Sequence, residues 1–405
     1  MTPQEQIAAD AEAFVVELAR ALGAWSTAAH RLEGLVQACA QQLGVEVTTF
    51  ALPTAVLVTT DAGDGPRTRV VRFEPGEPDI GRLVELDRVV ERVVSGEIGP
   101  RAAAREIRAI VTAPTQYGRL ASVGSFVIAS GCVGRFLGGS LDDALAAAAV
   151  GLAVGLLAIW ASNQRRMLRL VEFCSGLVAA LSAALLAGWL GVGEQAVMLA
   201  GLIILLPGMS LTVAVHELSQ RHLVAGTARL MGAVAVLVTI GFGIAVGHGI
   251  ADRLGLTTSV QTLTRGAMAG EWIALAIMPI ALVVLFRVGR REVWAVWVST
   301  IIGYIAARSF SGLLGMELGA CLAAFVVGGW ANLYSRAFNR PVAVAALPGV
   351  LVLVPGSVGM RSIASFLEQD TLGGVETAFR VVIVAIALVV GLLVANAALP
   401  ARKAI

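Results

Sequence analysis

The chain has 405 residues, of which 57% are hydrophobic and only 14% are charged, and its mean hydropathy is +0.81. Soluble globular proteins are about 45–50% apolar and about 25% charged, so the composition excludes a wholly soluble protein. The net charge of +2 comes with no dense run of Lys and Arg, and we therefore expect no nucleic-acid partner.

The charge divides the chain near Arg119. Residues 1–118 hold 16 Asp or Glu and 11 Arg, which is 27 of the 58 charged residues, whereas the remaining 287 positions hold 31. This shift predicts a soluble domain over residues 1–118, followed by a membrane domain. The polar, acidic N-terminus lacks the basic and apolar regions of a signal peptide, so we expect the soluble domain to lie in the cytoplasm.

The soluble domain is predicted to be a small α+β unit. Helical periodicity over residues 9–43 predicts a helix that bends or splits at Gly23, and short Val- and Thr-rich segments predict a β-meander. Pro114 ends the domain. The expected strands are 45–50, 55–60 and 68–73, and the expected later helices are 79–94 and 99–111.

We see no catalytic set of residues in the soluble domain, and we do not expect an enzyme. His30 and Glu33 lie three positions apart on one helix face, as a catalytic or sensing pair or as an ordinary surface contact. The four cysteines lie far apart in the sequence, which argues against a disulfide or a zinc pair. We expect no metal and no cofactor.

The membrane domain is predicted to be an α-helical bundle of about ten transmembrane helices, because a span needs about 20 apolar residues. The helices divide into two halves of five, over residues 119–249 and 271–398, joined by an extracytoplasmic loop at 250–270 and followed by a tail at 399–405. Since five is odd, the halves are predicted to be inverted repeats. The expected spans are 120–138, 143–161, 170–190, 196–215, 228–249, 271–287, 293–309, 313–331, 341–360 and 378–398.

Arg and Lys in the short loops predict the orientation. With both termini inside, the inner loops carry twelve basic residues and the outer loops carry four. The inner set is Arg165, Arg166, Arg169, Arg221, Arg229, Arg287, Arg290, Arg291, Arg336, Arg340, Arg402 and Lys403, and the outer set is Arg253, Arg265, Arg308 and Arg361.

Pro-Gly motifs interrupt the fourth span of each half, as LLPGMS at 205–210 and as LPG and VPGS at 347–349 and 354–357. Broken helices at matching positions of inverted repeats indicate the substrate site of a secondary transporter. Hydroxyls beside the breaks can bind a polar ligand or bond within their own helix. The candidate substrate residues are Pro207, Gly208, Ser210, Thr212, Pro348, Gly349, Pro355, Gly356 and Ser357.

Ionisable residues in or near spans are candidates for function. Several are also explained as helix caps, interfacial groups or residues at a helix end. The candidates for proton coupling are His216, Glu217, Glu317, Asp142 and Asp143, and the candidates for holding a carboxylate are Arg135, Arg308 and Arg361.

The segment Leu205–Leu230, LLPGMSLTVAVHELSQRHLVAGTARL, resembles the hallmark segment of the bacterial threonine/serine exporter family. SLDD at 140–143, TRVVRF at 68–73 and LPGVLVLVPGS at 347–357 are similar to further parts of that family in its fused form. The resemblance implies a multi-pass protein of the bacterial inner membrane that exports threonine and serine, coupled to the proton motive force.

We therefore predict a secondary transporter whose partners are a small amino acid, protons and the lipid bilayer; a homo-oligomer is left open. Two alternatives remain. One is a dicarboxylate exporter of the succinate type on the same scaffold, in which arginines would hold the second carboxylate. The other is a membrane-anchored enzyme or sensor that acts through residues 1–118. The absence of a GxxxxGK[ST] motif disfavours an ATP-driven pump.

Overall fold

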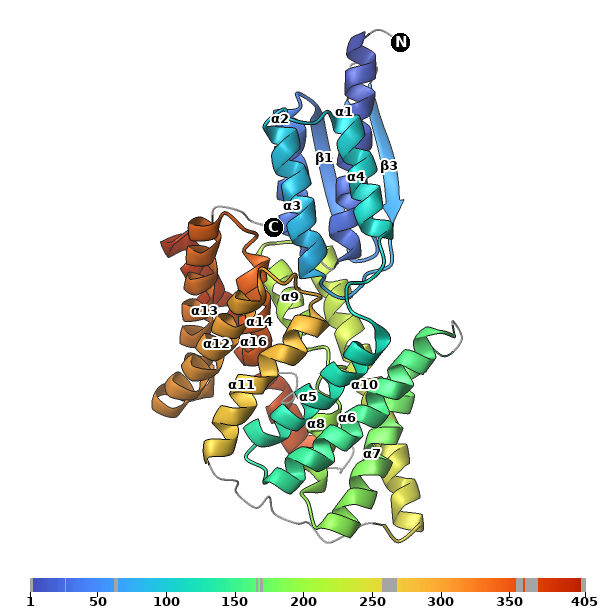
Figure 1. Ribbon diagram of the computed structural model, residues 1–405, viewed down its shortest axis with the longest axis vertical. Coiled ribbons are helices and arrows are strands. Elements are labelled where there is room, and N and C mark those ends of the chain that lie inside the picture. Colours follow the sequence, from blue (N-terminus) through green and yellow to red (C-terminus); the bar gives the residue numbers. More distant parts are fainter. Residues whose placement is uncertain are drawn as a thin grey trace.

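The computed structural model describes residues 3–25, 27–61, 65–164, 167, 170–256, 268–354, 360 and 371–401. Figure 1 shows an elongated molecule in which the N-terminal elements form a separate unit at one end of a helical bundle. Candidate residues Pro355, Gly356, Ser357 and Arg361 lie outside the described residues, so their assignments stay predictions.

The N-terminal unit combines four helices with a three-stranded antiparallel sheet of order β1-β2-β3. The long helix expected over 9–43 is two helices, because the backbone is extended at Ala28 (φ −62°, ψ 142°). Helix α1 packs against α2, α4 and the sheet, and its apolar side chains form the core. The elements are α1 (Pro3–Ala24), α2 (Ala29–Gln42), β1 (Glu46–Leu52), β2 (Ala55–Asp61), β3 (Pro66–Arg72), α3 (Ile80–Val94) and α4 (Pro100–Thr112).

The rest of the described chain is helical, and seven of its helices are long and apolar enough to cross a membrane. These are α6 (Leu141–Ser162), α7 (Val171–Leu190), α10 (Leu223–Arg253), α11 (Met268–Leu285), α12 (Val293–Leu314), α13 (Met316–Phe338) and α16 (Thr371–Ala398). The other helices are α5 (Arg119–Phe136), α8 (Glu194–Gly201), α9 (Gly208–Ser219) and α14 (Ala343–Leu353).

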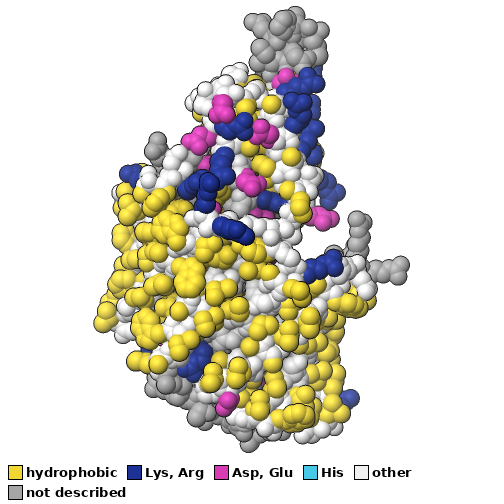
Figure 2. Space-filling view, in the orientation of Figure 1, with side chains coloured by type: hydrophobic (Ala, Val, Ile, Leu, Met, Phe, Trp, Pro, Cys, Tyr) yellow, Lys and Arg dark blue, Asp and Glu magenta, His cyan; other side chains and the backbone are white. Residues whose placement is uncertain are grey.

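The surfaces of the two parts differ in chemistry. Figure 2 shows charged side chains gathered on the N-terminal unit and a broad apolar surface over the bundle. Large apolar side chains on the long helices, such as Leu156, Phe242 and Phe379, are more than half exposed. Exposed apolar area of this extent marks an interaction surface, here with lipid. The chain is therefore a multi-pass membrane protein.

The two Pro-Gly segments differ: the first separates two short helices, whereas the LPG of the second lies inside α14. The span expected at 196–215 is two short helices, α8 and α9, separated by residues 202–207. Pro207 is the N-cap of α9, where its missing N–H costs nothing. In the span expected at 341–360, α14 ends at Leu353 and Val354 is extended, and residues 355–359 lie outside the described residues.

The N-terminal unit rests on loops of the bundle. The backbone N–H of Ile80 donates to the Phe286 carbonyl at 2.9 Å, and the Tyr117 hydroxyl donates to the Val288 carbonyl at 2.8 Å. Asn339, between α13 and α14, contacts Glu91 of α3 at 3.0 Å. The loop after α11 and the loop between α13 and α14 were both predicted to lie on the same side of the membrane as the N-terminus. The structure places both loops against the N-terminal unit.

Candidate functional site

A cavity of about 130 Å³ lies where the N-terminal unit meets the bundle. This space exceeds by several fold what one water molecule requires, so it can hold a small solute. Four sets of residues line it: Trp25, Thr27, Ala28, His30, Arg31, Pro78 and Leu83 of the N-terminal unit; Met209, Thr212, Val213 and His216 of α9; Val342, Ala343, Ala346, Leu347 and Val350 at α14; and Gly328, Ala331, Asn332, Leu392 and Asn396 of α13 and α16.

The two interrupted segments face each other across this cavity. Helix α9 contributes positions 209, 212, 213 and 216, and α14 contributes positions 343, 346, 347 and 350. Both sets have the spacing i, i+3, i+4 and i+7, which is one face of a helix. Met209 and Val350 each directly follow an LPG tripeptide. The α9 set follows its LPG motif, whereas the α14 set ends directly after its own, so Met209 and Val350 are the matching neighbours that meet at this space.

Arg31 supplies a positive charge to the cavity. It lies in the first turn of α2, and burial lowers the pKa of its guanidinium. Among the described residues no carboxylate pairs with it. Arg31 is partly buried, and a charge that is withdrawn from water is costly unless it is paired, so this guanidinium is suited to an anionic group of a ligand.

Two histidines meet beside Arg31. The Nε2 atoms of His30 and His216 lie 3.2 Å apart, and the ring of His222 lies 6.1 Å from that of His30. Burial, with the nearby charges of His216 and Arg31, lowers the pKa of His30 to about 3. The imidazole is therefore neutral at physiological pH, and one ring donates its Nε2–H to the other.

Neutral polar groups complete the lining. The amide of Asn332 in α13 donates to the amide oxygen of Asn396 in α16 at 2.8 Å. The Thr212 hydroxyl donates to the Gly208 carbonyl at 3.2 Å, which leaves its oxygen lone pairs available to accept. A cavity with mostly apolar walls and a few convergent polar groups is typical of a small-molecule site.

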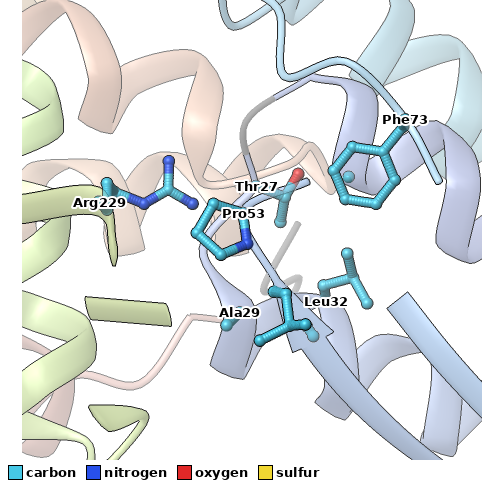
Figure 3. Close-up of a pocket in the computed structure, with 9 residues that line it drawn as sticks. Thr27, Ala29, Leu32, Pro53, Phe73 and Arg229 are labelled. Carbon is cyan, nitrogen blue, oxygen red and sulfur yellow. The ribbon is translucent and has the colours of Figure 1, made fainter. Parts of the chain in front are cut away.

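Glu217, beside His216, joins the bundle to the N-terminal unit. Its fully buried carboxylate accepts the backbone N–H of Ala29 at 2.9 Å, in the first turn of α2, and pairs with Arg229 of α10 at 3.1 Å. Figure 3 shows Arg229 directed toward Pro53 and Thr27 of the N-terminal unit. The void there, at about 10 Å³, has room for about one water molecule.

His216 and Thr212 are the only candidate residues among those described that line the cavity. Pro207, Gly208 and Ser210 lie at the start of α9, while Pro348 and Gly349 are buried on the far side of the α14 face. A side chain at Gly349 would come within 2.6 Å of Val327 Cγ1, so this glycine lets α14 pack closely on α13. Their roles in binding remain predictions.

The candidate acids outside the cavity have structural partners. Asp143 caps α6 through Ser140 and accepts the Gly193 N–H at 2.8 Å, and Asp142 is exposed in the same first turn. Glu317 lies 3.9 Å from Arg380. A carboxylate held by a helix N-terminus stabilises that helix without any transport role.

The candidate arginines also lie elsewhere. Arg308 pairs with the Glu271 carboxylate, and Arg135 is buried and donates to the Gly139 carbonyl. Neither lines the cavity. Their use as carboxylate ligands stays a prediction, and the cavity does not depend on it.

Sequence reasoning missed the charged part of this site. It named His30 only with Glu33, whereas the Glu33 carboxylate accepts the Ala51 N–H at 2.7 Å and His30 meets His216. Arg31, Asn332 and Asn396 were not selected. The polar pair Asn332 and Asn396 within otherwise apolar spans was a usable signal, because buried amides in membrane helices seek partners or ligands.

Comparison with known families decides the assignment. Residues 13–251 match the family described as "Putative threonine/serine exporter", and residues 271–398 match "Threonine/Serine exporter, ThrE". The chain belongs to the threonine/serine exporter family. The two matches adjoin the region 250–270 predicted to separate the two halves of the membrane domain. This is a family of exporters rather than of enzymes.

Named relatives come from fungi and bacteria. "Pheromone-regulated membrane protein 10" of Candida albicans is 27% identical over 86% of this chain and 33% of its own length, and that of Saccharomyces cerevisiae is 24% identical over 88% and 48%. The "Probable threonine/serine exporter" of Mycobacterium tuberculosis is 26% identical over 82% of this chain and 64% of its own length. The chain thus spans between about a third and two thirds of these relatives. No solved structure matches it.

Proposed function

We propose that this family member exports small hydroxy amino acids, threonine and serine, through the cavity between α9 and α14. The observation that carries the proposal is that one face of α9, which follows the first LPG motif, and one face of α14, which contains the second, line one small-molecule-sized space beneath the N-terminal unit. In secondary transporters a substrate site lies between repeats at interrupted helices. In a bacterial inner membrane, the N-terminal unit and the termini would face the cytoplasm, and the substrate would enter from that side.

The cavity offers complementary groups for a zwitterion. Arg31 suits the carboxylate, while Thr212 and the amides of Asn332 and Asn396 offer oxygens to an ammonium or hydroxyl group. The α14 wall of Ala, Val and Leu limits the size of the side chain. Short polar amino acids fit this combination better than long ones.

Proton coupling is proposed to use His216. A neutral imidazole can accept a hydrogen bond from the substrate ammonium, whereas an imidazolium repels it. Proton and amino acid would then exclude each other, which is the condition for antiport. The neighbouring Arg31 and His30 strengthen this exclusion, because a further positive charge beside them is unfavourable.

The dicarboxylate alternative requires a second fixed cation. Among the described residues that line the cavity, Arg31 is the one with a permanent charge, and Arg308 is already paired with Glu271. A single guanidinium balances a single carboxylate. The cavity thus favours an amino acid over a dicarboxylate.

Counterflow in proteoliposomes tests the proposal. Purified protein is loaded with unlabelled threonine, serine, leucine or succinate, and uptake of labelled threonine or succinate is followed with and without a pH gradient. We expect threonine and serine to exchange, with faster net flux under the gradient. Exchange of succinate alone would contradict the amino-acid proposal.

A further inference from the structure

We infer that Arg31 of the N-terminal unit is the carboxylate-binding residue of the cavity, so that the soluble unit supplies part of the substrate site. The inference deepens the proposed function and rests on it for the identity of the substrate. It assigns a ligand contact to a part of the chain that lies outside the helical bundle (Figure 1).

The first argument is the charge balance of the junction. Two guanidiniums approach this region, Arg31 from α2 and Arg229 from α10. Arg229 is satisfied by Glu217, with both Glu217 oxygens within 3.2 Å of its nitrogens. Arg31 faces the cavity, and no carboxylate among the described residues pairs with it. The anion that would balance Arg31 must therefore come from outside the described chain.

The second argument is the backbone around Arg31. It lies in the first turn of α2, a helix of 14 residues. The N–H groups of Arg31 and Leu32 already donate to the Ala28 carbonyl at 3.0 Å, but the positive end of the helix dipole still favours an anion beside this turn. A carboxylate already binds in the same turn, where Glu217 accepts the Ala29 N–H. A carboxylate at Arg31 would extend the same arrangement into the cavity.

The third argument is position. The lining residues next to Arg31 in the chain are Ala28 and His30, and His30 meets His216 of α9. A ligand carboxylate on Arg31 therefore sits beside the proposed proton-binding imidazole. The other end of the ligand can reach the α9, α13 and α14 walls that line the same space.

The site predicts a chemical class of ligand. A small molecule with one carboxylate and a short polar remainder satisfies Arg31 and fits about 130 Å³. An amide or ester of the same amino acid lacks the anion and should bind poorly. A longer apolar amino acid should be limited by the α14 wall instead.

The test measures binding apart from transport. Thermal unfolding of the full chain in detergent is followed with threonine, threoninamide, serine and lactate, for wild type, Arg31→Gln, Arg31→Lys and the control Arg105→Gln. Arg105 is exposed on α4 and does not line the cavity. Ligand that binds only the folded state raises the unfolding midpoint. Threonine counterflow is measured on the same four proteins.

We expect threonine to stabilise wild type and Arg105→Gln, and threoninamide to stabilise neither. Arg31→Gln should lose at least about thirtyfold in threonine affinity, because removing one partner of a buried charged pair costs at least that much. Arg31→Lys should recover part of the affinity. Its recovery, and the unchanged unfolding midpoint of Arg31→Gln without ligand, would separate binding from a folding defect.

Three outcomes are decisive. If Arg31→Gln keeps wild-type affinity and KM for threonine, the inference is overturned and the exporter proposal stands. If threonine and serine leave the unfolding midpoint of wild type unchanged, but lactate raises it in wild type and not in Arg31→Gln, the inference stands and the amino-acid proposal fails. If no carboxylate stabilises wild type, the inference is overturned.

Discussion

The cavity has two unlike sides. The side formed by α9 and the N-terminal unit carries Arg31, His30, His216 and Thr212, whereas the α14 side presents alanine, valine and leucine. Yet both sides contain an LPG tripeptide, at the start of α9 and inside α14, and both present the same helical spacing. The comparison suggests that a shared backbone geometry has been given different tasks. Under the proposed function, the polar side would recognise charge and the apolar side would set size.

The largest expected effect comes from removing the anchor of the polar side. Glu217→Ala leaves Arg229 with an unpaired buried charge and the Ala29 N–H without its acceptor. Breaking a buried ion pair in this way costs about 3–5 kcal/mol. Thermal unfolding should show the loss, and hydrogen exchange should show faster exchange at the start of α2.

The control for this prediction is Asp142→Asn, at an exposed carboxylate in the first turn of α6. Its effect should stay within about 0.5 kcal/mol. Equal unfolding midpoints for Glu217→Ala and Asp142→Asn would show that the N-terminal unit is not held by Glu217.

On the apolar side, Ala346→Phe should reduce the threonine counterflow rate by at least about tenfold, because the ring fills space that the substrate needs. Gly329→Ala on α13 is the control, since a Cβ at Gly329 would meet no atom within 4 Å. If both variants transport normally, the α14 face is not a wall of the substrate site.

The polar side also predicts a pH dependence of stability. The pKa of His30 is about 3 in the folded protein and 6.5 in the reference state, so the unfolded chain binds the proton first. The contribution of His30 to stability is therefore fully present above about pH 6.5 and is lost as the pH drops toward 3, by at most about 1.4 kcal/mol per pH unit. His216, His222 and Arg31 face this ring and oppose its protonation.

Replacing His30 with Gln should flatten the dependence of the unfolding free energy on pH between about pH 4 and pH 6.5. Chemical unfolding in detergent at several pH values measures this slope. A wild-type slope that survives the replacement would assign the protons to another group.

The smallest effect is expected away from both sides. Arg308 is about half exposed and pairs with Glu271. Arg308→Gln should change stability by less than about 1 kcal/mol and leave threonine counterflow unchanged. A large loss of succinate exchange in this variant would instead support the dicarboxylate reading.

Local patterns predicted much of the architecture. Apolar periodicity predicted helices and β-branched segments predicted the three strands, whereas only the first LPG motif marks an interruption in the described chain, because the second lies inside α14. The break between α8 and α9 follows from Pro207, which cannot continue a regular helix there. These features depend on neighbours in the sequence, and the sequence therefore reveals them.

The site was harder to predict because its polar groups come from distant parts of the chain. Arg31 and His216 are brought together by docking of the N-terminal unit, and Asn332 meets Asn396 only through packing of α13 on α16. Near a break, sequence reasoning selects the Pro and Gly themselves as the substrate-binding residues. The structure shows that the lining is formed by residues between the next position and about two turns away from the Pro and Gly.

The most direct test of the cavity as the substrate site is protection of a cysteine placed in its wall. Ala346→Cys would be alkylated in the presence of threonine, leucine or threoninamide. Native Cys39 should react slowly with the alkylating reagent because burial raises its thiol pKa to about 11. Alkylation of the other three native cysteines is measured in the protein without the Ala346→Cys substitution and subtracted. We predict that threonine slows alkylation whereas leucine and threoninamide do not. Unchanged alkylation under saturating threonine, in a variant that still transports threonine, would contradict the account.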